Sequence, residues 1–277
     1  MTTQSRLSRR SILTGTTLAF AAALLPRAAF ADTVADIKKR GKVLIGIQGD
    51  NPPWGFIDAS GVQQGFDADV GKMFAAYLGV TPEFVPLAVA NRIPALVTGR
   101  VDVLFATMAM LPDRAKAVQY SKPYVGNTIG LVAAKTTVIK TNADMKNVVI
   151  GVPRSSVQDT QVTKNAPEGT TIRRFDDDAA TIQELLSGQV QAVGSNMFYV
   201  QALDKSKPGM FESKLAFSTR YNGACSRLGD KEMNAALNAF IDKIVADGEL
   251  AKPYEKWMSA KPPVFATSVE GVPFSVQ

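Results

Sequence analysis

The chain has 277 residues, of which 31 are basic and 25 acidic, so its formal net charge is +6. It contains one cysteine, Cys225, and no histidine. The missing histidine excludes a Ser-His-Asp triad, a Cys-His pair and every metal site built on imidazole, and a single cysteine excludes an internal disulfide. Most hydrolase mechanisms are therefore excluded, and the sequence predicts neither a cofactor nor a metal site.

The N-terminus predicts an export signal at residues 1–31. Three arginines within the first ten residues precede an apolar run from Leu18 to Leu25, and Ala29-Phe30-Ala31 supplies the small-x-small pattern of a cleavage site. The segment Ser8–Leu13 is similar to a twin-arginine signal, with an ordinary Sec signal as the alternative. We therefore expect cleavage after Ala31 and a periplasmic protein.

Removal of this signal changes the charge of the chain. It takes away four basic residues and no acidic ones, so 27 basic and 25 acidic residues remain and the net charge falls to +2. The basic character of the full chain therefore belongs to the signal and does not indicate nucleic-acid binding. No later apolar run reaches the roughly 18 residues of a membrane span, so we expect a protein that does not cross the membrane.

The first half of the mature chain alternates strands and helices. Strands are predicted at Val43–Ile47, Glu83–Leu87 and Val101–Phe105, and helices at Gly65–Leu78 and Asn91–Val97. Apolar residues in the first helix recur three and four positions apart, as on one buried helix face. This βαβαβ order predicts half of a doubly wound α/β sheet.

The second half repeats the alternation. Strands at Val148–Val152, Thr171–Phe175 and Val190–Val193 each lead to a loop or helix, and the helices are predicted from Pro153 and from Asp178 to Leu186. Three extended segments remain, and we interpret them as crossings between domains: Tyr124–Ala134, Leu215–Thr219 and Gly223–Leu228. In the first of them, Gly126 and Gly130 would supply the backbone freedom of a hinge.

The chain ends in two helices and a tail. Asp230 is predicted to cap a long amphipathic helix through Val245, and Leu250–Met258 forms a last short helix. Residues 259–277 are rich in proline and small residues, so we expect a loose tail.

The segment Asp102–Lys122 carries the strongest candidate site. A short apolar strand runs into small and polar residues and then into Pro112-Asp113-Arg114. In open α/β sheets ligands sit beyond the carboxyl ends of strands, and a guanidinium can grip a carboxylate with two hydrogen bonds. The alternative is that Arg114 is a helix residue paired with Asp113 or another nearby acid.

Two further loops have alternative interpretations. Trp54 follows a strand on a loop stiffened by two prolines, and is either an exposed platform for a ligand's apolar part or a hydrophobic plug beneath the loop. Ser155 and Ser156 stand at a helix start, where they either help to bind an anion or only cap the helix.

The whole pattern resembles the periplasmic solute-binding proteins of ABC importers, in the subfamily that binds polar amino acids. The resemblance covers nearly all of Val43–Met258 and rests on VLIGIQGDNPPWGFID, QGFDADVGKMFAAYLGV, ANRIPALVTGRVDVLFATM, PDRAKAVQYSKPY, VIGVPRSSVQD and GDKEMNAALNAFIDKIVADGELAKPYEKW. It implies two α/β lobes joined by two hinge strands, with the ligand between them. Residues 32–127 and 222–258 would form lobe 1, and residues 128–221 lobe 2.

The resemblance also implies the ligand-binding residues. Arg114 matches the arginine that holds the ligand's α-carboxylate, and Arg92, in Asn91-Arg92-Ile93-Pro94, is similar to the arginine that meets the side-chain carboxylate in the glutamate/aspartate-binding branch. The full predicted set is Asn51, Trp54, Arg92, Thr107, Met108, Ala109, Arg114, Ser156, Val157, Gln158 and Asn196.

This chain departs from the family pattern at several positions. Asn196 stands where relatives carry an aspartate for the ligand's α-ammonium, so either another acid, such as Asp50 or Asp159, replaces it or the ligand is not an ordinary α-amino acid. Ala109 lacks the usual hydroxyl. Gln48 is neutral where the glutamate/aspartate branch has a basic residue, so an acidic ligand is favoured only slightly.

The resemblance implies a non-catalytic receptor that closes on a polar amino acid, acidic ones included, or on a related small carboxylate. It would act as a monomer and deliver its ligand to an inner-membrane ABC permease. The alternative is a periplasmic dehydratase of a prephenate-like acid on the same fold, which needs a positioned acid that Asn196 cannot supply. A sensor domain of a signalling protein is not expected, because the given sequence has no further domain after residue 277.

Overall fold

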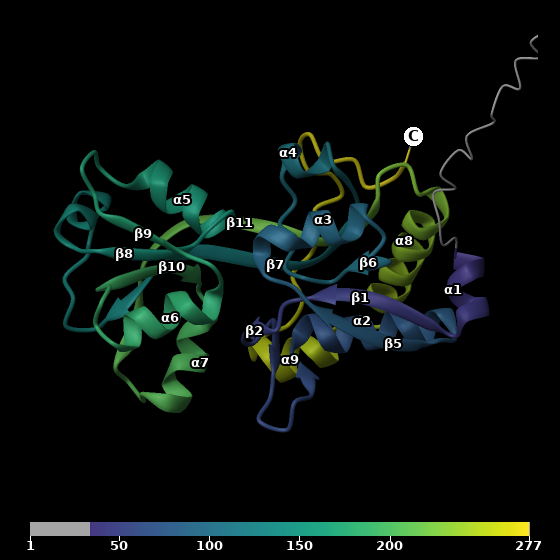
Figure 1. Cartoon of the computed structure of the whole chain (residues 1–277), viewed down its shortest axis with the longest axis horizontal. Helices are drawn as coiled ribbons and strands as arrows, with labels where there is room; N and C mark the ends of the chain where they lie inside the picture. Colours follow the sequence, from purple (N-terminus) through teal and green to yellow (C-terminus); the bar gives the residue numbers. More distant parts are fainter. Residues whose placement is uncertain (1–33, 277) are drawn as a thin grey trace, which may run out of the picture. The chain divides into compact units, whose positions relative to one another are not determined.

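The computed structural model describes residues 34–276. The predicted export signal and its cleavage after Ala31 lie outside these residues. No helix within residues 34–276 is long and apolar enough to cross a membrane. The structure belongs to the α/β class, with two lobes joined by two long strands (Figure 1).

The first lobe contains the predicted βαβαβ unit. Its parallel strands are β1 (Lys42–Ile47), β5 (Thr81–Pro86) and β6 (Val103–Leu104), and its crossover helices are α2 (Phe66–Leu78) and α3 (Arg92–Val97), the latter preceded by the 3-10 turn η1 (Val89–Asn91). Helix α2 buries Val70, Phe74 and Leu78, as the apolar spacing predicts, whereas Tyr77, which shares that spacing, is 41% exposed. It ends at Gly79 in the left-handed conformation that glycine adopts without strain.

Short elements complete this lobe. Helix α1 (Val34–Arg40) precedes β1, and a small antiparallel sheet of β2 (Asp50–Asn51), β3 (Gly55–Ile57) and β4 (Gln63–Gln64) follows it. Helix α4 (Pro112–Ala115) carries Arg114. The predicted Asp230 cap of α8 (Lys231–Ala246) is confirmed, because its carboxylate accepts a hydrogen bond from the Met233 amide at 3.0 Å.

The second lobe repeats the parallel arrangement. Strands β8 (Ile150–Pro153), β9 (Ile172–Phe175) and β10 (Ala192–Asn196) are covered by α5 (Val157–Asn165), α6 (Asp178–Leu186) and α7 (Tyr199–Ser206). Figure 1 shows these helices grouped around the three strands. Helix α7 and the 3-10 segment η2 (Asn142–Asn147) were not predicted.

Two long strands connect the lobes. β7 (Val118–Ala134) and β11 (Phe211–Arg227) pair in antiparallel fashion at the centre of one eight-stranded sheet of order β5-β1-β6-β11-β7-β10-β8-β9. The predicted crossing segments therefore exist, and the two return segments form one continuous strand. The hydroxyl oxygens of Thr128 and Thr219 lie 2.9 Å apart at the middle of this pair.

The two proposed hinge glycines differ in their surroundings. A Cβ on Gly130 would lie 2.0 Å from the Leu215 carbonyl oxygen, so glycine is required there for the close approach of β7 and β11. A Cβ on Gly126 would meet nothing within 4 Å. Packing therefore explains Gly130, and a hinge role for either residue stays a prediction.

The buried apolar residues form separate clusters in the two halves. Two clusters draw on residues 37–125 and 224–272, and two others draw on residues 131–211. These separate cores support the proposed division into lobe 1 (residues 32–127 and 222–258) and lobe 2 (residues 128–221). A small cluster of Ala109, Ile129 and Val157 lies where the lobes meet.

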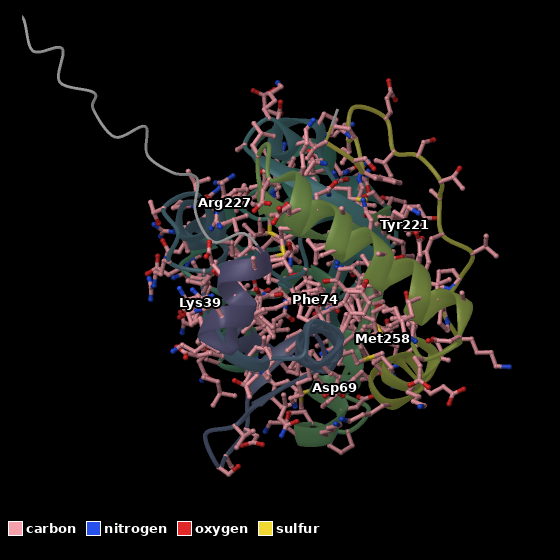
Figure 2. The ribbon with its side chains drawn as sticks, turned by 90° about the vertical axis from the view of Figure 1, so that its right-hand side faces the viewer. Lys39, Asp69, Phe74, Tyr221, Arg227 and Met258 are labelled. Carbon is pink, nitrogen blue, oxygen red and sulfur yellow. The ribbon has the colours of Figure 1, made fainter. Side chains whose placement is uncertain are left out.

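The expectation of a loose tail after helix α9 (Ala251–Met258) is wrong. Asn234 and Asn238 of α8 both donate side-chain hydrogen bonds to the Phe274 carbonyl, at 3.1 and 2.7 Å. Val272 is buried in the core of the first lobe. Figure 2 shows the tail, in yellow, running beside α8. The tail is held by side chains of α8 and by the apolar core of the first lobe. Because these contacts lie outside the tail, its own sequence could not predict them.

Candidate functional site

Side chains from both lobes enclose a cavity where the strands of each half end. Most of the predicted ligand-binding residues line it: Asn51, Arg92, Thr107, Ala109, Arg114, Ser156, Val157 and Gln158. It is also lined by residues that were not predicted: Gln48, Val89, Asn127, Ile129, Asp178, Arg220 and Asn222. The cavity measures about 20 Å³, close to the minimum that holds one water molecule. Any solute larger than water would therefore fit this space only if the lobes separated.

Arg92 is the most deeply buried cation of the site. Its side chain is 3% exposed, and its Nη1 donates to the Ala106 carbonyl at 2.8 Å and to the Thr107 hydroxyl at 3.2 Å. Its Nε and Nη2 are buried without a hydrogen-bond partner. Burial lowers the pKa of Arg92 to about 10. Buried donors are almost always paired in native proteins, so these two nitrogens are available to an acceptor from a ligand or from water.

Thr107 has a backbone conformation that β-branched residues rarely adopt. Its φ is 46°. Its amide donates to the buried carboxylate of Asp67 at 2.8 Å, and its hydroxyl donates to Gln48 Oε1. The other Asp67 oxygen accepts from the Tyr124 hydroxyl, and burial raises the pKa of Asp67 to about 6. These contacts hold the strained loop in place behind the cavity.

Arg114 does not pair with Asp113, which instead binds Lys116 at 2.7 Å. The Arg114 guanidinium reaches the other lobe, where Nη2 lies 3.4 Å from the Ser155 carbonyl oxygen. Within residues 34–276 no carboxylate oxygen lies within 4.0 Å of it. Arg114 therefore retains donors for a ligand carboxylate.

At the start of α5, the Ser156 hydroxyl accepts from the Asp159 amide at 3.0 Å and donates to the Pro153 carbonyl at 2.6 Å. The capping role is thus present, and an anion-binding role for residues 156–158 stays a prediction. Asp159 forms a surface ion pair with Arg174 at 2.9 Å and does not line the cavity.

The segment 48–51 of the first lobe contacts the second lobe directly. The Asp50 carboxylate accepts from the amides of Asp178 and Ala179 at the start of α6, at 3.0 and 3.1 Å. Gln48 Nε2 donates to the Asp178 carboxylate at 2.9 Å, and Asn196 Nδ2 donates to Asn51 Oδ1 at 3.3 Å. Burial raises the pKa of Asp50. These contacts exist only while the lobes are together.

Three predicted residues do not line this cavity. Trp54 is fully buried, with its ring edge-on to Phe66 and Phe198 at 5.9 and 5.8 Å, so the expected exposed platform is wrong and the hydrophobic plug is present. Met108 packs in the core of the first lobe and borders a neighbouring hollow of about 160 Å³. Asn196 is buried, with its amide turned to Asn51.

Asp178 is a cavity residue that sequence reasoning missed. Its side chain is 4% exposed, and burial, reinforced by the nearby Asp50 carboxylate, raises its pKa to about 7. The sequence did contain a signal for this residue. Asp178 follows the strand at Thr171–Phe175 and opens the next helix, which is where a ligand-binding residue of an α/β sheet is expected. Residues 34–276 contain no cluster of three acidic or cysteine side chains able to hold a metal ion.

Known proteins match this chain over most of its length. Residues 43–260 match the family described as bacterial extracellular solute-binding proteins, family 3. The L-cystine-binding protein TcyJ of Escherichia coli K12 is 27% identical over 227 residues, covering 81% of this chain and 85% of that protein. The ABC transporter glutamine-binding protein GlnH of Bacillus subtilis is 29% identical over 238 residues, covering 83% and 86%.

Solved structures agree with the family match. The solute receptor for L-cysteine of Neisseria gonorrhoeae superposes with a TM-score of 0.77 at 31% identity, covering 82% of this chain and 94% of that one. The ancestral amino acid-binding protein AncCDT-1, a precursor of cyclohexadienyl dehydratase, gives 0.74 at 31% identity, covering 81% and 98%. The chain therefore belongs to the bacterial extracellular solute-binding proteins of family 3.

Proposed function

We propose that this protein is the periplasmic substrate-binding component of an amino acid ABC importer. It would bind a polar amino acid, acidic ones included, or a related small carboxylate between its lobes and deliver it to a membrane permease. The observation that carries this proposal is the cavity itself, in which buried Arg92 donors without an acceptor share the wall with the Asp178 carboxylate. Relatives named as L-cystine- and glutamine-binding proteins match most of the same chain.

Two arginines would bind the anionic groups of the ligand. Arg114 would hold the α-carboxylate together with the start of α5, because its guanidinium lacks a carboxylate partner in the described residues. Arg92 would hold a second acceptor through Nε and Nη2. A dicarboxylic amino acid supplies both anionic groups, which is why we favour an acidic ligand.

Lobe closure would couple binding to delivery. The contacts of segment 48–51 with α6 and with Asn196 form only in the closed arrangement. A ligand that bridges Arg92 and Arg114 on the first lobe and α5 on the second favours this closed form over an open one. The permease would then recognise the closed form.

A thermal-shift screen tests the proposal. The purified protein is heated with each L-amino acid and with small dicarboxylates, and a ligand at about 100 times its Kd stabilises the fold by roughly 2.7 kcal/mol. We expect an increase in the melting temperature with at least one polar or acidic L-amino acid. The absence of a shift with every L-amino acid at millimolar concentration would refute the proposed function.

A dehydratase is the second candidate, and Asp178 is the observation in its favour. A buried carboxyl group whose pKa is about 7 can donate a proton near neutral pH, which Asn196 cannot do. The solved relative AncCDT-1 is described as a precursor of such an enzyme. Incubation with prephenate, followed by measurement of its consumption, tests this alternative. Stable prephenate at high protein concentration would rule it out.

A further inference from the structure

The partner of the ligand's ammonium group is the question that Asn196 leaves open. In this structure Asn196 cannot fill that role, because its side chain does not line the cavity and its amide nitrogen is directed to Asn51 of the other lobe at 3.3 Å. Its exposed fraction is only 1%. Any counter-charge for an ammonium must therefore come from another position.

Asp178 is a buried carboxylate at the cavity wall that forms no close ion pair with any described residue, although the more distant charge of Arg92 acts on it. Its one side-chain hydrogen bond comes from the neutral amide of Gln48, at 2.9 Å. Within residues 34–276 no lysine or arginine nitrogen lies within 4.0 Å of its oxygens. Burial of this anion without a contacting cation is unfavourable, and the distant charge of Arg92 offsets only part of the cost. A cation from the ligand, in contact with Asp178, would favour its ionised form.

The other nearby acids are already engaged. Asp50 accepts the two first amides of α6. Asp67 lies beneath the cavity wall, where it accepts from the Thr107 amide and the Tyr124 hydroxyl. Asp159 pairs with Arg174 at the surface. Among the described residues, Asp178 is therefore the acidic side chain that lines the cavity.

The wall also presents the matching positive group. Arg92 has two buried nitrogens without acceptors, and Asp178 and Arg92 line the same cavity from opposite lobes. A ligand that carries both an ammonium and a carboxylate would satisfy both groups at once, whereas the same carboxylate without the ammonium would leave Asp178 without a counter-charge. The charges of the wall thus discriminate between these two ligand classes.

We propose that Asp178, at the start of α6, is the residue that binds the α-ammonium of the ligand and selects amino acids over the corresponding carboxylates. This assignment rests on the proposed function. It moves the counter-charge from the end of strand β10, where Asn196 stands, to the adjacent helix of the same lobe. Closure of the lobes brings Gln48 against Asp178, so that the carboxylate is held in place once the ligand is enclosed.

Calorimetry with matched ligand pairs tests the assignment. The probes are L-glutamate against glutarate and L-cysteine against 3-mercaptopropionate, which differ only in the ammonium group. The parent protein should bind the tighter of the two amino acids at least tenfold more strongly than its analogue. Asp178→Asn should weaken the amino acid at least tenfold and change the analogue less than threefold.

Asp177→Asn is the matched control. It removes the same charge one residue earlier, where the side chain caps the Ala180 amide at 2.7 Å and does not line the cavity. Asparagine is an equally good helix cap, so both ligands should bind this variant within threefold of the parent. Asn196→Asp should give no gain for the amino acid, because position 196 does not face the cavity.

Separate outcomes overturn the assignment and the function on which it rests. If the parent binds an L-amino acid no better than its analogue, or if Asp178→Asn leaves the amino acid within threefold, Asp178 is not the ammonium site. An equal loss for both members of a pair also overturns it. If no L-amino acid binds the parent at all, the proposed function itself fails. The parent measurement needs no variant, so it remains decisive even if Asp178→Asn does not fold.

Discussion

Replacing Asp50 with alanine should weaken ligand binding without loosening either lobe. The Asp50 carboxylate accepts the amides of Asp178 and Ala179 at 3.0 and 3.1 Å, and these bonds join the first lobe to helix α6 of the second. In an open form α6 would lose this cap to water. The variant therefore acts on the equilibrium between open and closed forms.

The size of the effect follows from these two hydrogen bonds. Loss of a side-chain cap costs about 0.5–2 kcal/mol, and a carboxylate at a helix N-terminus contributes about 0.3–1 kcal/mol through the helix dipole. Burial raises the pKa of Asp50, so desolvation offsets part of the gain. We expect a net loss of about 1–2 kcal/mol in closure, which corresponds to a roughly 5- to 30-fold weaker Kd.

Calorimetry at pH 8 measures this effect, because Asp178, whose pKa is about 7, is then largely ionised in both proteins. Small-angle scattering reports the lobe arrangement of the same samples. Asp58→Ala is the control, since the Asp58 carboxylate also accepts two backbone amides, those of Ser60 and Val62, but within one lobe. An Asp50→Ala affinity within twofold of both the parent and Asp58→Ala would refute closure by this contact.

Four further predictions concern the arginines, the tail and a buried acid. Arg114→Ala should weaken binding by about 2–5 kcal/mol in calorimetry while the melting temperature stays unchanged; a Kd within threefold of the parent would remove Arg114 from the site. Arg92→Gln should weaken L-glutamate far more than L-glutamine, and an equal loss would show that Arg92 only supports the loop at Ala106 and Thr107. Val272→Ala should lower the free energy of unfolding by about 1–2.5 kcal/mol in urea titrations. The control Val264→Ala, at a site 95% exposed, should change that free energy by less than about 0.5 kcal/mol. Equal effects of the two variants would show that the tail is loose. Asp67, faced by Tyr124, Thr107 and Arg92, has its pKa raised by burial from 3.8 to about 6, so its contribution to stability should be lost as the pH rises from about 4 through 6. The loss should be on the order of 3 kcal/mol relative to Asp67→Asn, and parallel pH profiles would contradict it.

The order of elements was predictable because its signals are local. The apolar spacing in α2, the glycine that ends this helix and the aspartate that caps α8 act over three or four neighbouring residues. The alternation of strands and helices then restricts the topology to two doubly wound halves. The strand-end rule also predicted Arg114 at a ligand site, because parallel strands bring their carboxyl ends to one edge, whereas Thr107 was predicted from the family resemblance; both line the cavity.

The direction of individual side chains was decided by tertiary contacts. Trp54 is buried because Phe198, far along the chain, packs against its ring. Asn196 faces Asn51 only because the lobes close. The same closure brings Asp178 against Gln48, and Asp178, not Asn196, lines the cavity. The tail is held by asparagines of α8 and by an apolar core. The sequence by itself therefore determined which elements form and in what order, since those signals lie within a few residues. The tertiary structure decided which polar groups meet, since those contacts join residues that are distant in the sequence, by 36 positions for Asn238 and Phe274 and by 130 for Gln48 and Asp178.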